Sequence, residues 1–304
     1  MLKYLSPSSI RTYMEDPEDF YAKYMATDRA VRFAQTPPMA VGSGFDALVK
    51  CALSTDLTGS LDMLGVDSIR QLWEDQVSSE FWEADDDRDL WVDSFLAFNS
   101  YKDCGAYAQI LEEMARSVKE FGIGSIGFES TLQGELAGVP FLGKPDAHWK
   151  CMVDDVPVQV IHDWKVNGFY SSMSPYKYYY KVLPAGTPHK LFKGLAGLDP
   201  PVSDTPLHMV KNIWAEQEAV YGWLLGVPVG GMILGSFHQI VRSRAGVFRT
   251  GCFRHFIDPS WQQAYFSAAC DLWSMVQKHI SGSVLLFDDD MLSAQNRVAG
   301  EMSL

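Results

Sequence analysis

The sequence predicts a mixed α/β (α+β) fold in which a central mixed sheet is flanked by helices. Apolar residues recur at helical spacing up to about residue 121, and the spacing changes to alternation over residues 128–166. A helical stretch, two strand-like stretches and a closing helix then follow. The 304 residues, 47% of them hydrophobic, suffice for one large core, so we expect a single domain.

The predicted helices have recognisable ends. Ser8 and Ser9 can cap an N-terminal helix that breaks at Asp16-Pro17, and Gly122 can end a long helix that begins at Tyr101. The helical segments are residues 8–24, which form one or two short helices, 42–50, 69–81, 101–121, 207–225 and 259–279.

Alternation predicts the strands. A meander of three strands is expected at residues 128–136, 139–149 and 156–166, and two more strands at 231–241 and 247–257. Residues 177–206 are rich in Pro, Gly and Lys and too long for a simple connection, which is typical of functional or disordered loops. Glycines and a proline interrupt the apolar stretch 219–237, so we expect a helix, a turn and a buried strand there rather than a membrane span.

Charge is segregated along the chain. The net charge of -13 by itself argues against a non-specific nucleic-acid binder. However, residues 56–103 carry 13 acidic and 3 basic side chains, which account for -10 of that total. Lysines between 165 and 211 and arginines between 242 and 254 form basic segments that could line a groove. The acidic segment is interpreted as a solvated insertion, with a nucleic-acid mimic or a docking surface for a basic partner as the alternative.

The remaining composition bounds the setting of the protein. Its five widely spaced cysteines contain no Cys-x-x-Cys pair, so we expect neither a disulfide framework nor a zinc or iron-sulfur site. The N-terminus lacks a secretory signal, and a cytoplasmic location is expected. We divide the single domain into an N-terminal helical region 1–55, the acidic helical insertion 56–103, a core 104–257 and a C-terminal helix and tail 258–304.

Two carboxylates fall where adjacent strands would meet. Asp146 is predicted on the second strand and Asp163 near the end of the third, so both can sit side by side at one end of the sheet. Two close carboxylates repel unless a cation lies between them, which makes the pair a candidate Mg²⁺ or Mn²⁺ site. Alternation places Lys165 on the same face as Asp163, and Trp164 on the other. The same spacing equally permits a simple salt bridge at the sheet edge.

With these residues, the chain resembles the PD-(D/E)XK nuclease superfamily, in its RecB-like and lambda-exonuclease-like branch. Five segments resemble motifs of that branch in the same order: Leu5–Ile10 with Asp16-Pro17 and Phe20-Tyr21, Gly42–Asp46 in place of Gly-x-x-x-His, Pro145-Asp146, Asp163-Trp164-Lys165, and Gln217–Tyr221 as Gln-x-x-x-Tyr. They span about 70% of the chain. The resemblance implies a restriction-endonuclease-like αβββαβ core with helical additions at both termini, so that residues 104–257 would be the catalytic core.

The resemblance also implies roles for individual residues. Asp146 and Asp163 would be the principal metal ligands, with the backbone carbonyl of Trp164 as a third, and Lys165 would be the catalytic lysine. Glu129 would contact the metal directly or through water, or else be an ordinary strand acid.

Asp46 and Asp16 depart from the family pattern. Asp46 replaces the usual histidine and would keep a metal-binding role, whereas Asp16 stands at an iron-sulfur cysteine position, so no cluster is expected.

A further set of residues is expected to bind DNA or to brace the site. Gln217 and Tyr221 lie one helical turn apart, where they would brace the lysine or contact the DNA backbone, or simply form a polar pair at the edge of the core. The other members of the set are Ser8, Lys177, Lys181, Arg242 and Arg244.

The function expected from the motifs is hydrolysis of DNA phosphodiester bonds with Mg²⁺ or Mn²⁺, by an exonuclease of recombination, replication or repair in a bacterium or a phage-infected cell. Two alternatives remain open: a non-catalytic member that binds DNA or a replication partner, and a structure-specific endonuclease. DNA is the expected partner, with a recombination or replication protein as a second one; no membrane partner is expected, and a homo-oligomer is an option by analogy.

Overall fold

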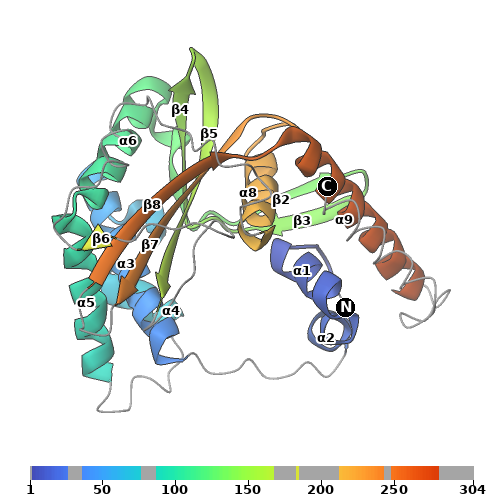
Figure 1. The fold of residues 1–304 in the computed structure, drawn as a ribbon, viewed down its shortest axis with the longest axis horizontal. Helices are drawn as coiled ribbons and strands as arrows, with labels where there is room; N and C mark the ends of the chain where they lie inside the picture. Colours follow the sequence, from blue (N-terminus) through green and yellow to red (C-terminus); the bar gives the residue numbers. More distant parts are fainter. Residues whose placement is uncertain are drawn as a thin grey trace.

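A mixed six-stranded sheet forms the centre of the computed structural model, which describes residues 2–26, 36–76, 87–167, 183–184, 212–242 and 248–280 (Figure 1). The strands follow the order β1-β4-β5-β7-β8-β6, in which β5 and β7 are parallel and the other pairs are antiparallel. They are β1 (Gly127–Phe128), β4 (Ala147–Val153), β5 (Val156–Asn167), β6 (Leu183–Pro184), β7 (Ile233–Arg242) and β8 (Phe248–Phe256). The mixed α/β fold predicted from the sequence is confirmed.

A separate hairpin and the helices complete the described fold. The hairpin joins β2 (Leu132–Leu136) to β3 (Val139–Gly143). The helices are α1 (Pro7–Glu15), α2 (Pro17–Phe20), α3 (Pro37–Thr58), α4 (Ile69–Gln76), α5 (Asp87–Asp103), α6 (Ala106–Phe121), α8 (Asn212–Leu224) and α9 (Pro259–Ile280). Shorter helical turns are Tyr21–Met25, Asp62–Leu64 and Ile123–Ser125.

Local sequence explains the helix ends. The Ser6 hydroxyl accepts a hydrogen bond from the backbone N–H of Ser9 at 3.2 Å, and the Ser9 hydroxyl accepts one from the N–H of Ser6 at 2.8 Å, so the two serines cap α1 reciprocally. Asp16 caps α2 without such reciprocity, because its Oδ1 accepts hydrogen bonds from the backbone N–H groups of Glu18 and Asp19, both at 3.0 Å. Gly59, with φ of 77°, ends α3 because only glycine adopts this conformation without steric cost.

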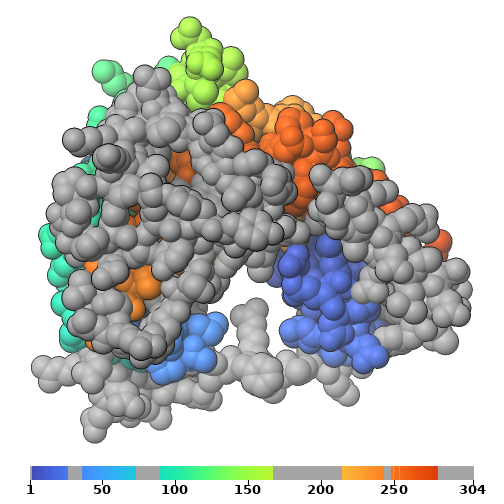
Figure 2. Space-filling model, viewed as in Figure 1, coloured from blue at the N-terminus to red at the C-terminus, as the bar shows by residue number. Residues whose placement is uncertain are grey.

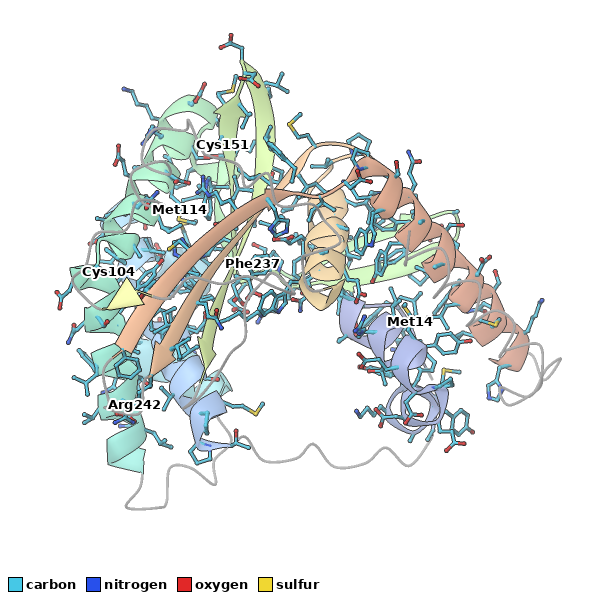
Figure 3. All side chains as sticks on the ribbon, viewed as in Figure 1. Met14, Cys104, Met114, Cys151, Phe237 and Arg242 are labelled. Atoms are coloured by element: carbon cyan, nitrogen blue, oxygen red, sulfur yellow. The ribbon has the colours of Figure 1, made fainter. Side chains whose placement is uncertain are left out.

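The two faces of the sheet are covered by different helices. Helices α3, α5 and α6 pack on one face around buried side chains such as Trp149, Tyr101 and Met114; Figure 3 shows Met114, Cys104 and Cys151 in this layer. Helices α1, α8 and α9 form the other core together with β3, where Phe141 packs against Phe266. In the space-filling view the blue N-terminal residues adjoin the orange-red residues of the C-terminal part (Figure 2).

Three predicted elements are each divided in the structure. The strand predicted at 128–136 breaks into β1 and β2, because Glu129 has φ of 50° and turns the chain out of the main sheet. The strand predicted at 139–149 breaks at residues 144–146, so β3 pairs with β2 and β4 joins the main sheet. The helix predicted at 101–121 divides at Gly105, with φ of 87°, between α5 and α6. The sequence does not predict these three breaks, because glycine and proline interrupt the apolar pattern there only briefly.

The segment 219–237 has the predicted division. Helix α8 ends at Leu224 and β7 begins at Ile233, with the residues between them in turns. Among the described residues, we find no helix with both the length and the apolar character that crossing a membrane requires. All five cysteines are free thiols in the structure.

The acidic segment 56–103 includes part of the core. In α5, Ala97 and Tyr101 are fully buried and Phe98 nearly so, and the helix packs against α3 and β8. Residues 87–103 are therefore not a solvated appendage, because α5 contributes buried apolar side chains to the core beneath the sheet. The predicted elements at residues 77–81 and 207–211 and the predicted loop at 177–206 lie outside the described residues, apart from β6.

Candidate active site

Asp146 and Asp163 face each other at one end of the β4–β5 pair. Ala147 pairs with His162 in antiparallel register, so the residue before Ala147 and the residue after His162 come opposite each other. The two carboxyl groups share a hydrogen bond, and the backbone N–H of Trp164 donates to Oδ2 of Asp146 at 3.2 Å. Asp146 lies immediately before β4 rather than within a strand, because the chain bends at residues 144–146. The predicted juxtaposition nevertheless follows from the register.

Lys165 lies on the same face of β5 as Asp163. Its Nζ contacts Oδ2 of Asp163, and both side chains are partly exposed. Trp164 between them points into the core around α5, where its indole N–H donates to the Tyr101 hydroxyl at 3.2 Å. Alternation along β5 therefore separates the polar pair from its apolar support, as the sequence predicts.

A second group of charges adjoins the pair from α3 and β1. Asp46 on α3, Glu129 after β1 and Asp146 bring one carboxylate oxygen each within 4.8 Å of one another, a spacing that can hold a metal ion. The Nζ of Lys50, one helical turn after Asp46, contacts Oδ2 of Asp46 and Oε1 of Glu129 and lies 3.5 Å from Oδ1 of Asp146. Lys144 approaches Glu129 from outside, with its Nζ 2.6 Å from Oε2.

These side chains line an open cavity of about 450 Å³. Helix α3 contributes one wall, and β5 contributes the other together with Glu129 after β1 and Asp146 before β4. The lining residues are Met39, Gly42, Ser43, Asp46, Glu129, Asp146, Asp163, Trp164, Lys165 and Val166. The cavity therefore presents carboxylate oxygens and one ammonium group to solvent within a single concave surface.

The electrostatics of the acid pair are those of two carboxyl groups competing for one proton. Burial raises the pKa of Asp163, and the nearby Asp146 adds to the rise. Burial acts against ionisation of Asp146 as well, but Lys50 and the hydrogen bond from Asp163 outweigh it and lower the pKa of Asp146. Burial also raises the pKa of Asp46 to about 7. A divalent cation between Asp146 and Asp163 would replace the shared proton. Carboxylate oxygens are the ligands that Mg²⁺ and Mn²⁺ prefer.

Tyr101 supports the site from the core, a role that no feature of the sequence indicates. Its hydroxyl lies 2.5 Å from Nδ1 of His238 on β7 and accepts the hydrogen bond from Trp164, so it links α5 to two strands beneath the carboxylates. It belongs to the acidic segment, where nothing local distinguishes it. Lys50 was also missed, although its position four residues after Asp46 on a helix is a signal that could have identified an ion pair.

The motif on α8 reaches the same end of the sheet. The Tyr221 ring packs over Gly143, where an added Cβ would come within 2.6 Å of it. Burial raises the pKa of Tyr221, and the negative charges of Asp163 and Asp146 raise it further. Gln217 is half-buried one turn earlier on α8, and its bracing role stays a prediction. Ser8 on α1 is exposed, with its hydroxyl 3.0 Å from that of Ser6, and its DNA-binding role also stays a prediction.

The structure pairs two arginines of the predicted basic groove with acids. Arg242, at the end of β7 beside α5 (Figure 3), contacts Asp93 of the acidic segment. Arg254 on β8 is only 1% exposed and contacts Glu113 of α6, which is also 1% exposed, so Arg254 does not belong to a surface groove. Counting charges along the chain cannot detect such pairing. Lys177, Lys181 and Arg244 lie outside the described residues.

Comparison with known proteins gives one structural similarity. No protein-family model and no curated protein matches the sequence. Among solved structures, the chain is similar to a "Putative exonuclease" from Eubacterium rectale, with a TM-score of 0.39 and 13% identity over 95% of this chain and 87% of that one.

Proposed function

We propose that this protein is a metal-dependent nuclease that hydrolyses phosphodiester bonds in DNA, and in particular an exonuclease. The observation that carries the proposal is the position of Asp146 opposite Asp163, with Lys165 beside Asp163 in an open cavity. Two carboxylates and an ammonium group on adjacent strands suit a hard cation and a phosphate together. DNA as the substrate is supported by the resemblance of the five sequence motifs to RecB-like nucleases.

Each residue has a chemical task in this proposal. Asp146, Asp163 and the backbone carbonyl of Trp164 would hold Mg²⁺ or Mn²⁺, which neutralises charge on the phosphate and makes a bound water more acidic. Lys165 would donate a hydrogen bond to the attacking water or to a phosphate oxygen and offset the charge that develops there. Tyr101 would keep Trp164, and with it the backbone between Asp163 and Lys165, in a fixed position.

A non-catalytic DNA-binding or partner-binding protein is the second candidate. Close carboxylates repel one another unless a cation balances their charge. In this site lysine ammonium groups already balance most of that charge. Four carboxylates, Asp46, Glu129, Asp146 and Asp163, contact three ammonium groups. Such a cluster is stable without metal, so the acid set alone does not establish catalysis.

Cleavage of end-labelled DNA tests the proposal. Linear duplex and single strands are incubated with Mg²⁺, with Mn²⁺ or with a chelator, and we expect metal-dependent release of nucleotides from ends. Asp163→Ala and Lys165→Ala should each lower the rate at least about 100-fold, since general acid–base and electrostatic groups contribute about 10² or more. Lys150→Ala, on the exposed side of β4, is the matched control and should keep wild-type activity.

The outcomes separate the candidates. Full activity in either site variant would refute the assignment of the site. Absence of cleavage by the wild type on every substrate, with DNA binding retained, would favour the non-catalytic candidate. Cleavage of closed circular plasmid at a rate comparable to that of linear DNA would identify an endonuclease instead of an exonuclease.

A further inference from the structure

Lys50 lies where a cation would otherwise be needed. Its side chain is 0% exposed, and its Nζ is surrounded by carboxylate oxygens from three separate segments: Asp46 on α3, Glu129 after β1 and Asp146 before β4. The ammonium group donates hydrogen bonds to Asp46 and Glu129, and the carboxylate of Asp146 adds an ion-pair contact at 3.5 Å. The Trp164 ring closes the remaining side, with its centroid 5.9 Å from Nζ.

The fold holds this ammonium group in place. Asp46 and Lys50 are four residues apart on α3 and so share one face of the helix. Glu129 reaches them from a left-handed backbone conformation, with φ of 50°, which is costly for a residue other than glycine and persists only where the surroundings enforce it. Its backbone N–H bonds to the carbonyl of Asp146 at 3.3 Å, which ties two of the three carboxylates together.

The same three carboxylates have the spacing of a metal site. One oxygen from each lies within 4.8 Å of the others, but the Lys50 ammonium group already contacts them. A buried ammonium and a divalent cation cannot share this space, because their repulsion at such short distance would be large. Asp163, by contrast, pairs with Lys165 and shares a hydrogen bond with Asp146, and among the described residues its ion pairs do not include Lys50.

We propose that Lys50 is a built-in cation that fills one of two cation positions in the site, so that the protein binds a single divalent ion, next to Asp146 and Asp163. This inference rests on the proposed metal-dependent function. Lys50 acts as a positioning residue: it orients Asp46, Glu129 and Asp146 and supplies the charge that a second ion would supply. Asp46 and Glu129 accordingly hold Lys50 rather than metal.

Counting bound Mn²⁺ on the full chain tests the inference. Calorimetric titration and electron paramagnetic resonance should give one Mn²⁺ per wild-type chain, with the spectrum of an isolated ion. Lys50→Met keeps the length of the side chain but removes its charge, so we expect two Mn²⁺ per chain and a spectrum of two coupled ions. Lys144→Met is the matched control, because Lys144 contacts the same Glu129 from a side chain that is 56% exposed; it should bind one ion.

The result also separates this inference from the proposed function. Two ions on the wild type, or one ion on both the wild type and Lys50→Met, would overturn the role of Lys50 and leave a metal-dependent nuclease intact. No ion on the wild type would overturn the metal-dependent function and, with it, the inference of a single bound ion. If Lys50→Met does not fold, Lys50→Gln replaces it in the same titration. The wild-type count is an independent test, because two Mn²⁺ per wild-type chain would overturn the inference.

Discussion

The buried ion pair between Arg254 and Glu113 should respond asymmetrically to loss of either partner. Both side chains are 1% exposed, so neither charge can turn to water when its partner is removed. At an effective dielectric constant of about 20, two unit charges about 3 Å apart attract each other by about 5 kcal/mol. Removal of one partner from a buried pair typically lowers the free energy of unfolding by about 3–5 kcal/mol.

The two single variants differ in how the remaining charge can relax. After Glu113→Gln, the guanidinium group of Arg254 cannot lose its proton, so the full loss of about 3–5 kcal/mol should persist at every pH. After Arg254→Met, the carboxyl group can become neutral by taking up a proton. For an ordinary carboxyl group this costs about 3.7 kcal/mol at pH 7 and about 1 kcal/mol at pH 5. The penalty of Arg254→Met should therefore fall by about 2–3 kcal/mol between pH 7 and pH 5.

Urea unfolding followed by tryptophan fluorescence measures both penalties against the wild type at each pH. The double variant Glu113→Leu with Arg254→Met should lose less than either single variant, because no buried charge is left without a partner. Equal, pH-independent penalties for the two single variants, or penalties below 1 kcal/mol, would refute the burial of this pair.

Two further predictions concern Glu216 and Tyr101. Burial raises the pKa of Glu216, 0% exposed on α8 and 3.1 Å from Arg11, to about 7. The protonated carboxyl group of Glu216 is therefore compatible with folding at low pH, and stability is lost as the pH rises from about 4.5 to 7. Glu216→Gln should be more stable than the wild type by up to about 3 kcal/mol at pH 8 and equal to it at pH 4. Thermal unfolding across this pH range checks the slope, and a pH-independent difference would contradict it. Tyr101→Phe removes the acceptor of the Trp164 indole N–H and should cost about 1–3 kcal/mol in urea unfolding, whereas a loss under 0.5 kcal/mol would show that the bond contributes little.

Much of the local structure could be predicted from residues close together in the sequence. A serine cap at the start of α1, and the position of Asp163 and Lys165 on one face of β5, depend on spacings of two or three residues, although the capping residue is Ser6 and not Ser8. The proximity of Asp146 to Asp163 also followed, because a short connection between antiparallel strands fixes their register. The breaks that separate β1 from β2 and β3 from β4 did not follow, since they depend on which sheet each strand joins.

Charge was the property that the sequence described least well. The net charge and its segregation are visible along the linear sequence. The burial of Arg254 against Glu113, 141 residues earlier, and the pairing of Arg242 with Asp93, 149 residues earlier, are not. The sequence identified Asp46 as a candidate metal ligand but not Lys50 as its partner. The role of Lys50 depends on its contacts with Glu129 and Asp146, which lie in other segments of the chain. The types and order of the chemical groups were thus determined by the sequence alone. Which charges neutralise one another was decided by the tertiary structure, because an ion pair depends on distance and burial rather than on position along the chain.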